Sequence, residues 1–237
     1  MRIVSLTSVP PRFGGLGPVL ESLLAQRPAP DRVVLALPRA YRRFPGQVDP
    51  PALPAGVTLL RTGTDHGPAT KLLAPLDAWP DASRVVYCDD DCLYGDGWLS
   101  ELEGAAARLT RPAIVAASGF DIARLKRRPV RPDPSAKDGW TDVAQGFGGV
   151  LVPVAALGAR LVPPPQAAFA ADDLWLSAQF AARGVPIALA PAARAAVTPL
   201  DRPEGLQDAR FDGRGRAALY RETVMLAAER FDVWPPI

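Results

Sequence analysis

The stretch Val85-Val86-Tyr87-Cys88-Asp89-Asp90-Asp91 decides the fold, because an apolar run leads directly into three carboxylates. The apolar part is typical of a buried parallel strand. Open α/β sheets bind their ligands beyond the carboxyl ends of the strands, which is where the three aspartates follow. Alternate side chains at a strand end point the same way, so we expect Asp89 and Asp91 to converge and Asp90 to turn aside.

Two converging carboxylates repel each other unless a cation lies between them. Their hard oxygen atoms suit Mg²⁺ or Mn²⁺, ions that complete their coordination with water and substrate phosphates. The pattern therefore predicts a divalent-metal site for a phosphorylated ligand, with Asp89 and Asp91 as metal ligands. The alternative is a solvated turn, or the acidic start of a helix.

Short apolar strands alternate with helical periodicity along the chain, which predicts an α/β fold with a mostly parallel central sheet and helices on both faces. The expected strands span residues 3–7, 33–37, 57–60, 84–88, 114–117, 147–152 and 185–190. The expected helices span 16–24, a segment from Trp98 to Leu109, 172–183 and about 219–230. A polar turn is expected over 64–71, and the basic, proline-rich segment 124–134 is expected to be a loop.

The composition is ordinary for a globular chain of 237 residues, with 48% hydrophobic and 22% charged residues. A formal net charge of +2 gives no reason to expect a nucleic-acid partner. No apolar run reaches the about 18 residues of a membrane span, and the first residues are too interrupted for a signal peptide. The two cysteines, Cys88 and Cys92, are expected to be buried free thiols. We therefore expect a soluble, cytoplasmic protein, with peripheral membrane contact as an open alternative.

Four segments, in this order, resemble the GT-A-fold glycosyltransferases, and in particular the family 2-like bacterial enzymes. They are residues 5–13 (SLTSVPPRF), 65–72 (DHGPATKL), 85–91 (VVYCDDD) and 172–177 (DDLWLS). The resemblance runs from residue 3 to about residue 190. It implies one Rossmann-like nucleotide-diphospho-sugar transferase domain over 1–237, in which 1–117 binds the nucleotide sugar and 118–237 binds the acceptor.

The resemblance also implies an activity. The chain would be a hexosyltransferase-type enzyme that moves a sugar from a nucleotide-diphosphate donor to a hydroxyl acceptor, assisted by Mn²⁺ or Mg²⁺. The acceptor would be a glycan, a lipid-linked molecule or a small molecule, as in polysaccharide biosynthesis. A metal ion suits this chemistry because it neutralises the charge that develops on the leaving diphosphate.

By the same resemblance, individual residues acquire expected roles on the donor side. Asp91 would bind the metal directly, and Asp89 would contact the metal or the ribose, with Asp90 beside them in the donor site. Lys71 would add a positive charge at the phosphates, against the alternative of a solvated lysine. The remaining donor-site candidates on the first loop are Thr7, Pro10 and Arg12, which would border the nucleoside, with a surface arginine as the alternative for Arg12. Asp65 would touch the base or ribose, or else form an Asx-turn.

On the acceptor side, the resemblance points to Asp173 or Asp172 as the base that takes the proton of the acceptor hydroxyl. The alternative is that these residues only cap the helix that they open. Residues 145–149 would shape the acceptor site, or else form only a tightly packed strand entry. Many metal-dependent members carry a third ligand, often histidine, near the carboxyl end. The single histidine here is His66, so Asp208, Asp212 or water would have to serve instead.

Two other functions share parts of this pattern. A sugar-nucleotide pyrophosphorylase would have the same fold and metal, but its first loop should be glycine-rich and basic, whereas this chain has Ser-Val-Pro-Pro-Arg over 8–12. A non-catalytic nucleotide- or carbohydrate-binding relative would keep the fold without turnover. The basic residues 124–128 would attract an anionic acceptor or a membrane surface, or form a solvated loop.

Overall fold

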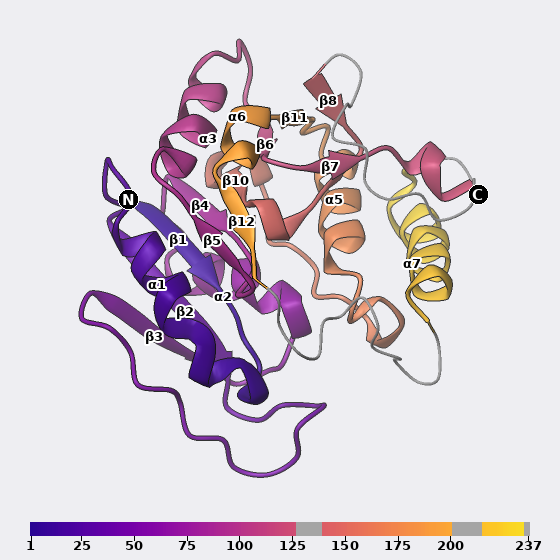
Figure 1. Cartoon of the computed structure of the whole chain (residues 1–237). Coiled ribbons are helices and arrows are strands. Elements are labelled where there is room, and N and C mark those ends of the chain that lie inside the picture. The colour runs from indigo at the N-terminus through magenta and orange to yellow at the C-terminus, as the bar shows by residue number, and fades with distance from the viewer. Residues whose placement is uncertain (127–138, 201–214, 235–237) are drawn as a thin grey trace.

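A computed structural model of the chain describes residues 1–126, 139–200 and 215–234 (Figure 1). The centre of the molecule is an eight-stranded sheet. In spatial order its strands are β3 (Val57–Thr62), β2 (Arg32–Pro38), β1 (Arg2–Leu6), β4 (Arg84–Tyr87), β10 (Val150–Pro153), β6 (Ile114–Ala116), β11 (Ile187–Leu189) and β8 (Trp140–Thr141). Two small sheets pair β12 (Val197–Pro199) with β5 (Cys92–Tyr94), and β7 (Gly119–Phe120) with β9 (Val143–Ala144).

The sheet is mostly parallel, as expected. Strands β3, β2, β1 and β4 run parallel to one another, and β6 runs parallel to β11. Strand β10 lies antiparallel between β4 and β6, so β4 and β6 point the same way. The carboxyl ends of β1, β4, β6 and β11 therefore meet at one edge of the sheet, and this is the edge where the aspartates follow β4.

Helices cover both faces of the sheet, because the strand residues alternate between two cores. The helices are α1 (Leu16–Leu24), α2 (Thr70–Ala78), α3 (Trp98–Ala107), α4 (Val154–Leu157), α5 (Asp172–Ala182), α6 (Pro191–Ala195) and α7 (Arg216–Phe231). In β4, Val86 packs with α1 and α3, whereas Val85 and Tyr87 pack with α2 and α5. Alternation beyond Tyr87 then directs Asp89 toward the face that carries α2.

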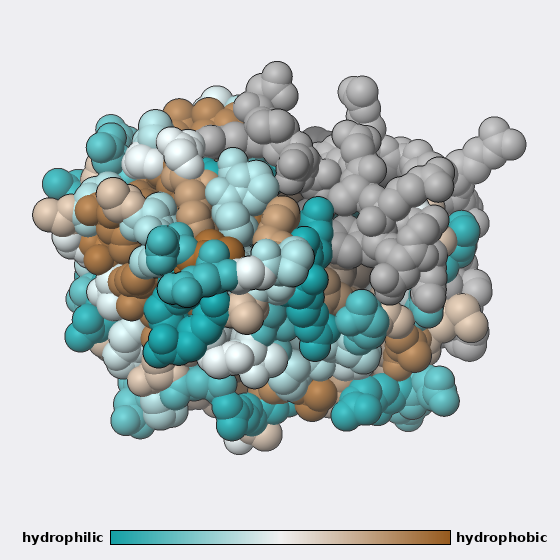
Figure 2. Space-filling view, turned by 90° about the horizontal axis from the view of Figure 1, so that it is seen from below, coloured by the Kyte–Doolittle hydropathy of each residue, from teal (hydrophilic) through white to brown (hydrophobic). Residues whose placement is uncertain are grey.

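Helix α7 packs on α5 through a smaller third core, and Figure 1 shows the two helices side by side, on the opposite side of the molecule from β1 to β3. This core consists of Phe120, Ile122, Val143, Ala171, Leu174 and Val224. Figure 2 views the molecule from below Figure 1, and on the described part of that face hydrophilic residues are interspersed with hydrophobic ones.

Several sequence expectations are corrected in detail. The strand expected over 147–152 begins only at Val150, because Gly146–Gly148 form a 3-10 turn and Gly149 has a φ of +96°. A Cβ atom on Gly149 would lie 2.3 Å from the Trp98 ring, so only glycine fits there. The polar turn expected over 64–71 ends early, since α2 begins at Thr70. The sequence pattern also predicts neither helix α2, the short helices α4 and α6, nor the strands β5, β7, β8, β9 and β12.

Other expectations meet the structure as follows. Cys88 and Cys92 are free and buried, as predicted. Neither Asp172 nor Asp173 caps α5, whose N-cap is Ala171 without a side-chain hydrogen bond. Within the described ranges, no helix has the length and apolar character needed to cross a membrane. Most of the basic segment 124–134 lies outside the described residues, as do Asp208 and Asp212.

Candidate active site

The middle aspartate of the triplet is buried and is held by the loop after β1. Asp90 is buried, with 5% of its surface exposed. Its carboxylate accepts a hydrogen bond from Ser8 Oγ at 2.5 Å and one from Arg12 Nη1 at 2.5 Å. Ser8 and Arg12 both belong to the loop after β1, so Asp90 ties the end of β4 to that loop and fixes the turn that carries the other two aspartates.

The outer aspartates remain accessible. The side chains of Asp89 and Asp91 are 33% and 32% exposed. Asp91 Oδ2 lies 3.5 Å from Arg12 Nη1. Burial, and then the charges of Asp89 and Asp90, raise the pKa of Asp91 above its ordinary value. The charge of Asp89 is therefore one of those that act on the Asp91 carboxylate.

Lys71 is buried between Asp89 and Asp172. It lies in the first turn of α2, and not in a loop as expected. Its Nζ atom lies 2.6 Å from Asp89 Oδ1 and 2.9 Å from Asp172 Oδ2, and its side chain is 2% exposed. It also lies 5.5 Å from the centre of the Tyr87 ring. Burial opposes the charge of the amine, but Asp172, followed by Asp89 and Asp173, raises its pKa well above the ordinary value.

The two aspartates that open α5 have different surroundings. Asp172 is 6% exposed and faces Lys71. Asp173 is half-buried, and its Oδ1 accepts a hydrogen bond from the backbone N–H of Gly146 at 3.0 Å. Burial, and then the charge of Asp172, raise the pKa of Asp173 to about 7. Asp173 is thus the accessible member of the pair, with a pKa suited to proton transfer near neutral pH.

Gly146 makes this arrangement possible, because a side chain at that position would collide with it. A Cβ atom on Gly146 would lie 2.6 Å from Lys71 Nζ and 3.1 Å from Asp89 Oδ1. The glycine-rich segment 145–149 therefore packs directly on the ion pair. This tight packing is one of the two alternatives that the sequence left open for it.

The other sequence-predicted donor residues lie around the end of β1 and in the loop before α2. Thr7 Oγ1 donates to the Ala36 carbonyl at 2.7 Å, which joins the ends of β1 and β2. Pro10 begins the 3-10 turn Pro10–Gly15. Asp65 is 9% exposed and accepts bonds from the backbone N–H groups of Gly67 and Arg42, each at 2.8 Å. Asp65 thus forms the Asx-turn considered as its alternative role.

The donor set fits a divalent cation that is shared with a ligand. Two accessible carboxylates, Asp89 and Asp91, supply hard oxygen atoms. The pKa of Asp91 is raised first by burial and then by the charges of Asp89 and Asp90, and a cation would offset those charges. Among the described residues, no group of three histidine, cysteine, aspartate or glutamate side chains is arranged to hold a metal. Such an ion would need oxygen atoms from a diphosphate and from water to complete its shell.

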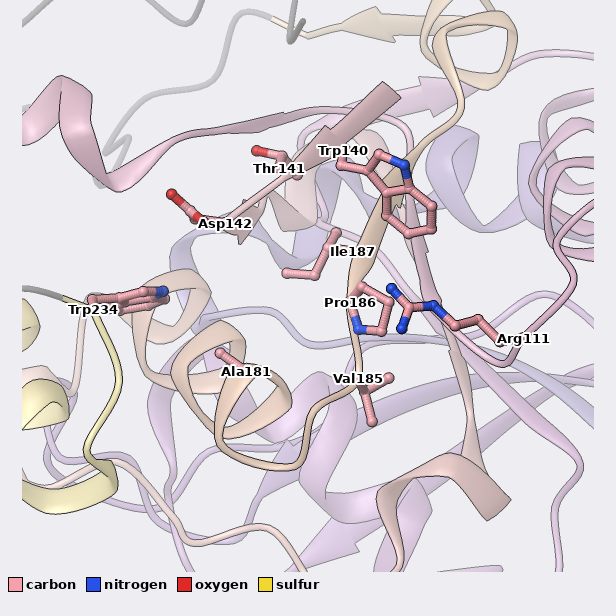
Figure 3. A pocket seen from close by; sticks show the side chains of 9 residues that line it. All are labelled: Arg111, Trp140, Thr141, Asp142, Ala181, Val185, Pro186, Ile187 and Trp234. Atoms are coloured by element: carbon pink, nitrogen blue, oxygen red, sulfur yellow. The ribbon is translucent and has the colours of Figure 1, made fainter. Parts of the chain in front are cut away.

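A cavity of about 330 Å³ lies at the other edge of the sheet (Figure 3). Its walls include Arg111, which precedes β6, and Val185 to Ile187, which lead into β11. Trp140 and Trp234 lie at its two ends (Figure 3). None of the sequence-predicted site residues lines it, because these residues gather at the carboxyl ends of the strands.

The sequence pattern does not identify three polar residues that lie near the aspartates of the candidate site. Ser8 belongs to the first of the four segments, but the pattern assigns it no role, although its hydroxyl donates a hydrogen bond to Asp90. Arg216 and Tyr220, at the start of α7, lie in the electrostatic field of Asp173. Helical periodicity indicated the helix, but no motif connects its first turn to α5, so only the three-dimensional packing reveals them.

The chain is similar to known proteins in its fold but matches none of the sequences compared. No protein-family model matches the chain, and no curated protein matches it. A mycobacterial protein superposes with a TM-score of 0.58 at 14% identity, over 99% of this chain and 76% of that one. Glucosyl-3-phosphoglycerate synthase from Mycobacterium tuberculosis, in complex with Mn²⁺, UDP and phosphoglyceric acid, gives 0.57 at 13% identity, over 99% and 80%. Its complex with Mg²⁺ and UDP gives 0.56 at 13%, over 99% and 80%. These likenesses confirm the expected GT-A fold.

Proposed function

We propose that this chain is a metal-dependent glycosyltransferase, which moves a sugar from a nucleotide-diphosphate donor to a hydroxyl group of an acceptor. The observation that carries the proposal is the ion-paired group in which Lys71 joins Asp89, beyond β4, to Asp172, at the start of α5. This group brings Asp89, a carboxylate suited to a metal, next to the aspartate pair of α5, whose other member, Asp173, is suited to act as a base. Metal-dependent transfer with an activated acceptor hydroxyl uses both at one centre.

On the donor side, Asp89 and Asp91 would hold Mg²⁺ or Mn²⁺, which supplies positive charge to the departing diphosphate. The synthase that shares the fold has been crystallised with each of these ions together with UDP. Arg12 and Ser8 support the site indirectly, because they hold Asp90 and with it the turn between Asp89 and Asp91. The nucleoside would lie along the loop after β1, beside Thr7 and Pro10.

On the acceptor side, Asp173 would act as the general base. The acceptor oxygen forms a bond to the anomeric carbon, the bond from that carbon to the diphosphate breaks, and the hydroxyl proton passes to Asp173. The nucleoside diphosphate leaves with the bonding electron pair. A pKa of about 7 leaves Asp173 largely ionised at slightly alkaline pH, yet basic enough to take a proton.

Lys71 would act as a positioning residue and not as a phosphate ligand. Its buried amine is already engaged by Asp89 and Asp172, and Gly146 closes over it. Its charge offsets the carboxylates of both sides. It also favours the ionised form of Asp173, and so keeps the pKa of the base from rising further.

The direct test is a panel of nucleotide sugars incubated with the purified protein and Mn²⁺ or Mg²⁺, with release of nucleoside diphosphate as the readout. We expect metal-dependent release from at least one donor. Asp91→Asn should abolish it, because the amide is neutral and a weaker metal ligand. The matched control is Asp96→Asn, since Asp96 is exposed in the turn that follows β5.

A second readout tests the base. Displacement by a hydroxyl that Asp173 activates inverts the anomeric carbon, so an α-linked donor should give a β-linked product by NMR. Retention of configuration would exclude Asp173 as the base of a single displacement. Full activity of Asp91→Asn, or turnover that chelation leaves unchanged, would refute the metal-dependent reaction.

A further inference from the structure

A cationic side chain that the proposed reaction does not use lies at the start of α7. Arg216 Nη2 donates a hydrogen bond to Tyr220 Oη at 2.6 Å. The guanidinium carbon lies 5.0 Å from the centre of the Tyr220 ring. Tyr220 therefore holds the guanidinium in one position, which lowers the entropy that Arg216 would lose on binding a ligand.

Tyr220 is itself fixed against the wall that carries the aspartate pair. Its ring stacks on Phe120, with centres 6.4 Å apart and planes 9° from parallel. Both rings pack in the core that contains Ala171 and Leu174, the residues on either side of Asp172 and Asp173. Helix α7 packs alongside α5 (Figure 1), and Arg216 is the first residue of α7, a helix separate from those that carry the proposed donor residues.

Arg216 interacts electrostatically with Asp173, the proposed base. Burial works to lower the pKa of Arg216, but Tyr220, Asp173 and Asp172 together raise it. Burial, and then Asp173, raise the pKa of Tyr220 to about 12. Within the part of the chain that the structure describes, Arg216 forms no ion pair with a carboxylate, and its one hydrogen bond is to Tyr220.

We propose that Arg216 and Tyr220 bind an oxyanion of the acceptor, so that the acceptor class is a hydroxyl compound that also carries a phosphate or a carboxylate group. This inference rests on the proposed transferase function, because it places the anion beside the hydroxyl that Asp173 activates. A guanidinium offers two parallel N–H donors that match either group. Tyr220 Oη accepts from Arg216 and still has its own proton to donate to the same anion.

The rival explanation is that Arg216 only tunes Asp173. A tuning arginine would change the pH dependence of transfer to every acceptor alike. An anion-binding arginine would change the preference between charged and neutral acceptors. The ratio of kcat/KM values for two acceptors, measured with one donor and one preparation, separates these roles because effects common to both acceptors cancel.

The test uses the full-length protein, a donor identified by the panel, and three acceptors of similar size: glucose, glucose 6-phosphate and glucuronate. We expect the wild type to prefer one of the two anionic sugars over glucose by about tenfold or more in kcat/KM. Arg216→Gln should reduce that ratio to near one, and Tyr220→Phe should lower it partly. Arg221→Gln is the matched control, since Arg221 is exposed on the same helix, and it should keep the wild-type ratio.

Three results would overturn the inference. The wild type could use glucose as well as both anionic sugars. Arg216→Gln could keep the preference. Alternatively, Arg216→Gln could lower kcat/KM equally for all three acceptors while shifting the pH profile, which would establish the tuning role instead.

Binding of methyl phosphate to the metal-free protein, followed by NMR, makes the test independent of turnover. Binding that Arg216→Gln weakens about tenfold, and that Asp173→Asn strengthens by removing a repelling charge, supports the anion site. If such binding occurs but no donor is turned over, the transferase proposal fails while the anion site stands. If donors are turned over but Arg216→Gln binds methyl phosphate as the wild type does, the anion site fails alone.

Discussion

Lys71 Nζ lies 2.9 Å from Asp172 Oδ2, and this contact joins the first turn of α2 to the first turn of α5. Only 2% of the Lys71 side chain and 8% of the Asp172 side chain are exposed, so bulk water solvates neither charge well. The same amine lies 2.6 Å from Asp89. The three groups form one ion-paired unit in which a single ammonium faces two carboxylates, so removal of Lys71 leaves both carboxylates without this counter-charge.

Replacement of Lys71 by methionine should therefore destabilise the fold strongly. The substitution keeps most of the volume but leaves Asp172 buried without a counter-charge, a situation that typically costs about 3–5 kcal/mol. Denaturant unfolding monitored by circular dichroism measures the loss. The control is Arg160→Met, which breaks an ion pair with Asp77 between two exposed side chains and should change the stability little. Equal, small losses for both variants would mean that Lys71 does not hold the unit together.

The pH dependence of transfer should report Asp173. A base works only when ionised, and the pKa of Asp173 is about 7. At saturating metal, kcat/KM should rise about tenfold per pH unit below pH 7 and level off above it. Lys71 lowers the pKa of Asp173, so in Lys71→Met the inflection should move to higher pH. A profile with no inflection between pH 6 and 8 would argue against Asp173 as the base.

Asp173 should also make the protein less stable as the pH rises. Its pKa in the folded chain, about 7, is above the ordinary value of 3.8, so folding favours the protonated form. The stability from this group is complete below about pH 4 and is lost as the pH rises through 7. Asp173→Asn cannot ionise but can still accept the Gly146 hydrogen bond through its amide oxygen. Its melting temperature should therefore exceed that of the wild type at pH 8, and the difference should shrink toward pH 5. A difference that stays constant with pH would show that Asp173 is not the titrating group.

The parts of the fold that the sequence predicts well depend on local patterns. The strands β1, β2 and β4 are apolar runs that end in polar or proline residues, and α1 follows its leucine spacing, so each was expected within one or two residues of its observed bounds. Alternation beyond Tyr87 agrees with the different partners of Asp89 and Asp90, which are Lys71 and Arg12, but it does not predict that Asp91 also lies 3.5 Å from Arg12 Nη1. These features need only the geometry of a strand or a helix.

The parts that the sequence does not predict depend on contacts between distant segments. The two-residue strands β7 and β9 have too few residues to show a pattern. The ion pairs of Lys71 and the partnership of Arg216 with Tyr220 arise where α2, α5 and α7 meet. Neither Asp172 nor Asp173 takes the cap position that is the alternative to their base role. The Asp172 carboxylate lies against Lys71 and that of Asp173 accepts the Gly146 N–H, contacts that local sequence does not reveal.

Substitution of Gly146 is the sharpest test of the proposed centre. This residue packs against Lys71 and Asp89, and its N–H donates to Asp173. A methyl group there would lie 2.6 Å from Lys71 Nζ and 3.1 Å from Asp89 Oδ1, distances too short for van der Waals contact. In Gly146→Ala, Lys71 must therefore move away from Asp89, or the segment that donates to Asp173 must shift. Since displacements of about 1 Å in a catalytic centre can cost on the order of 100-fold in rate, we expect kcat to fall by about ten- to 100-fold.

The matched control is Gly17→Ala in α1, where an added Cβ would meet no atom within 4 Å. It should leave kcat unchanged and raise the melting temperature slightly, because alanine favours helix over glycine by about 1 kcal/mol. Steady-state kinetics and thermal unfolding of the two variants together separate a local effect from a global one. If Gly146→Ala kept wild-type kcat, the contact between segment 145–149 and the Lys71–Asp89 pair would have no part in catalysis, since the added methyl group cannot fit without disturbing it.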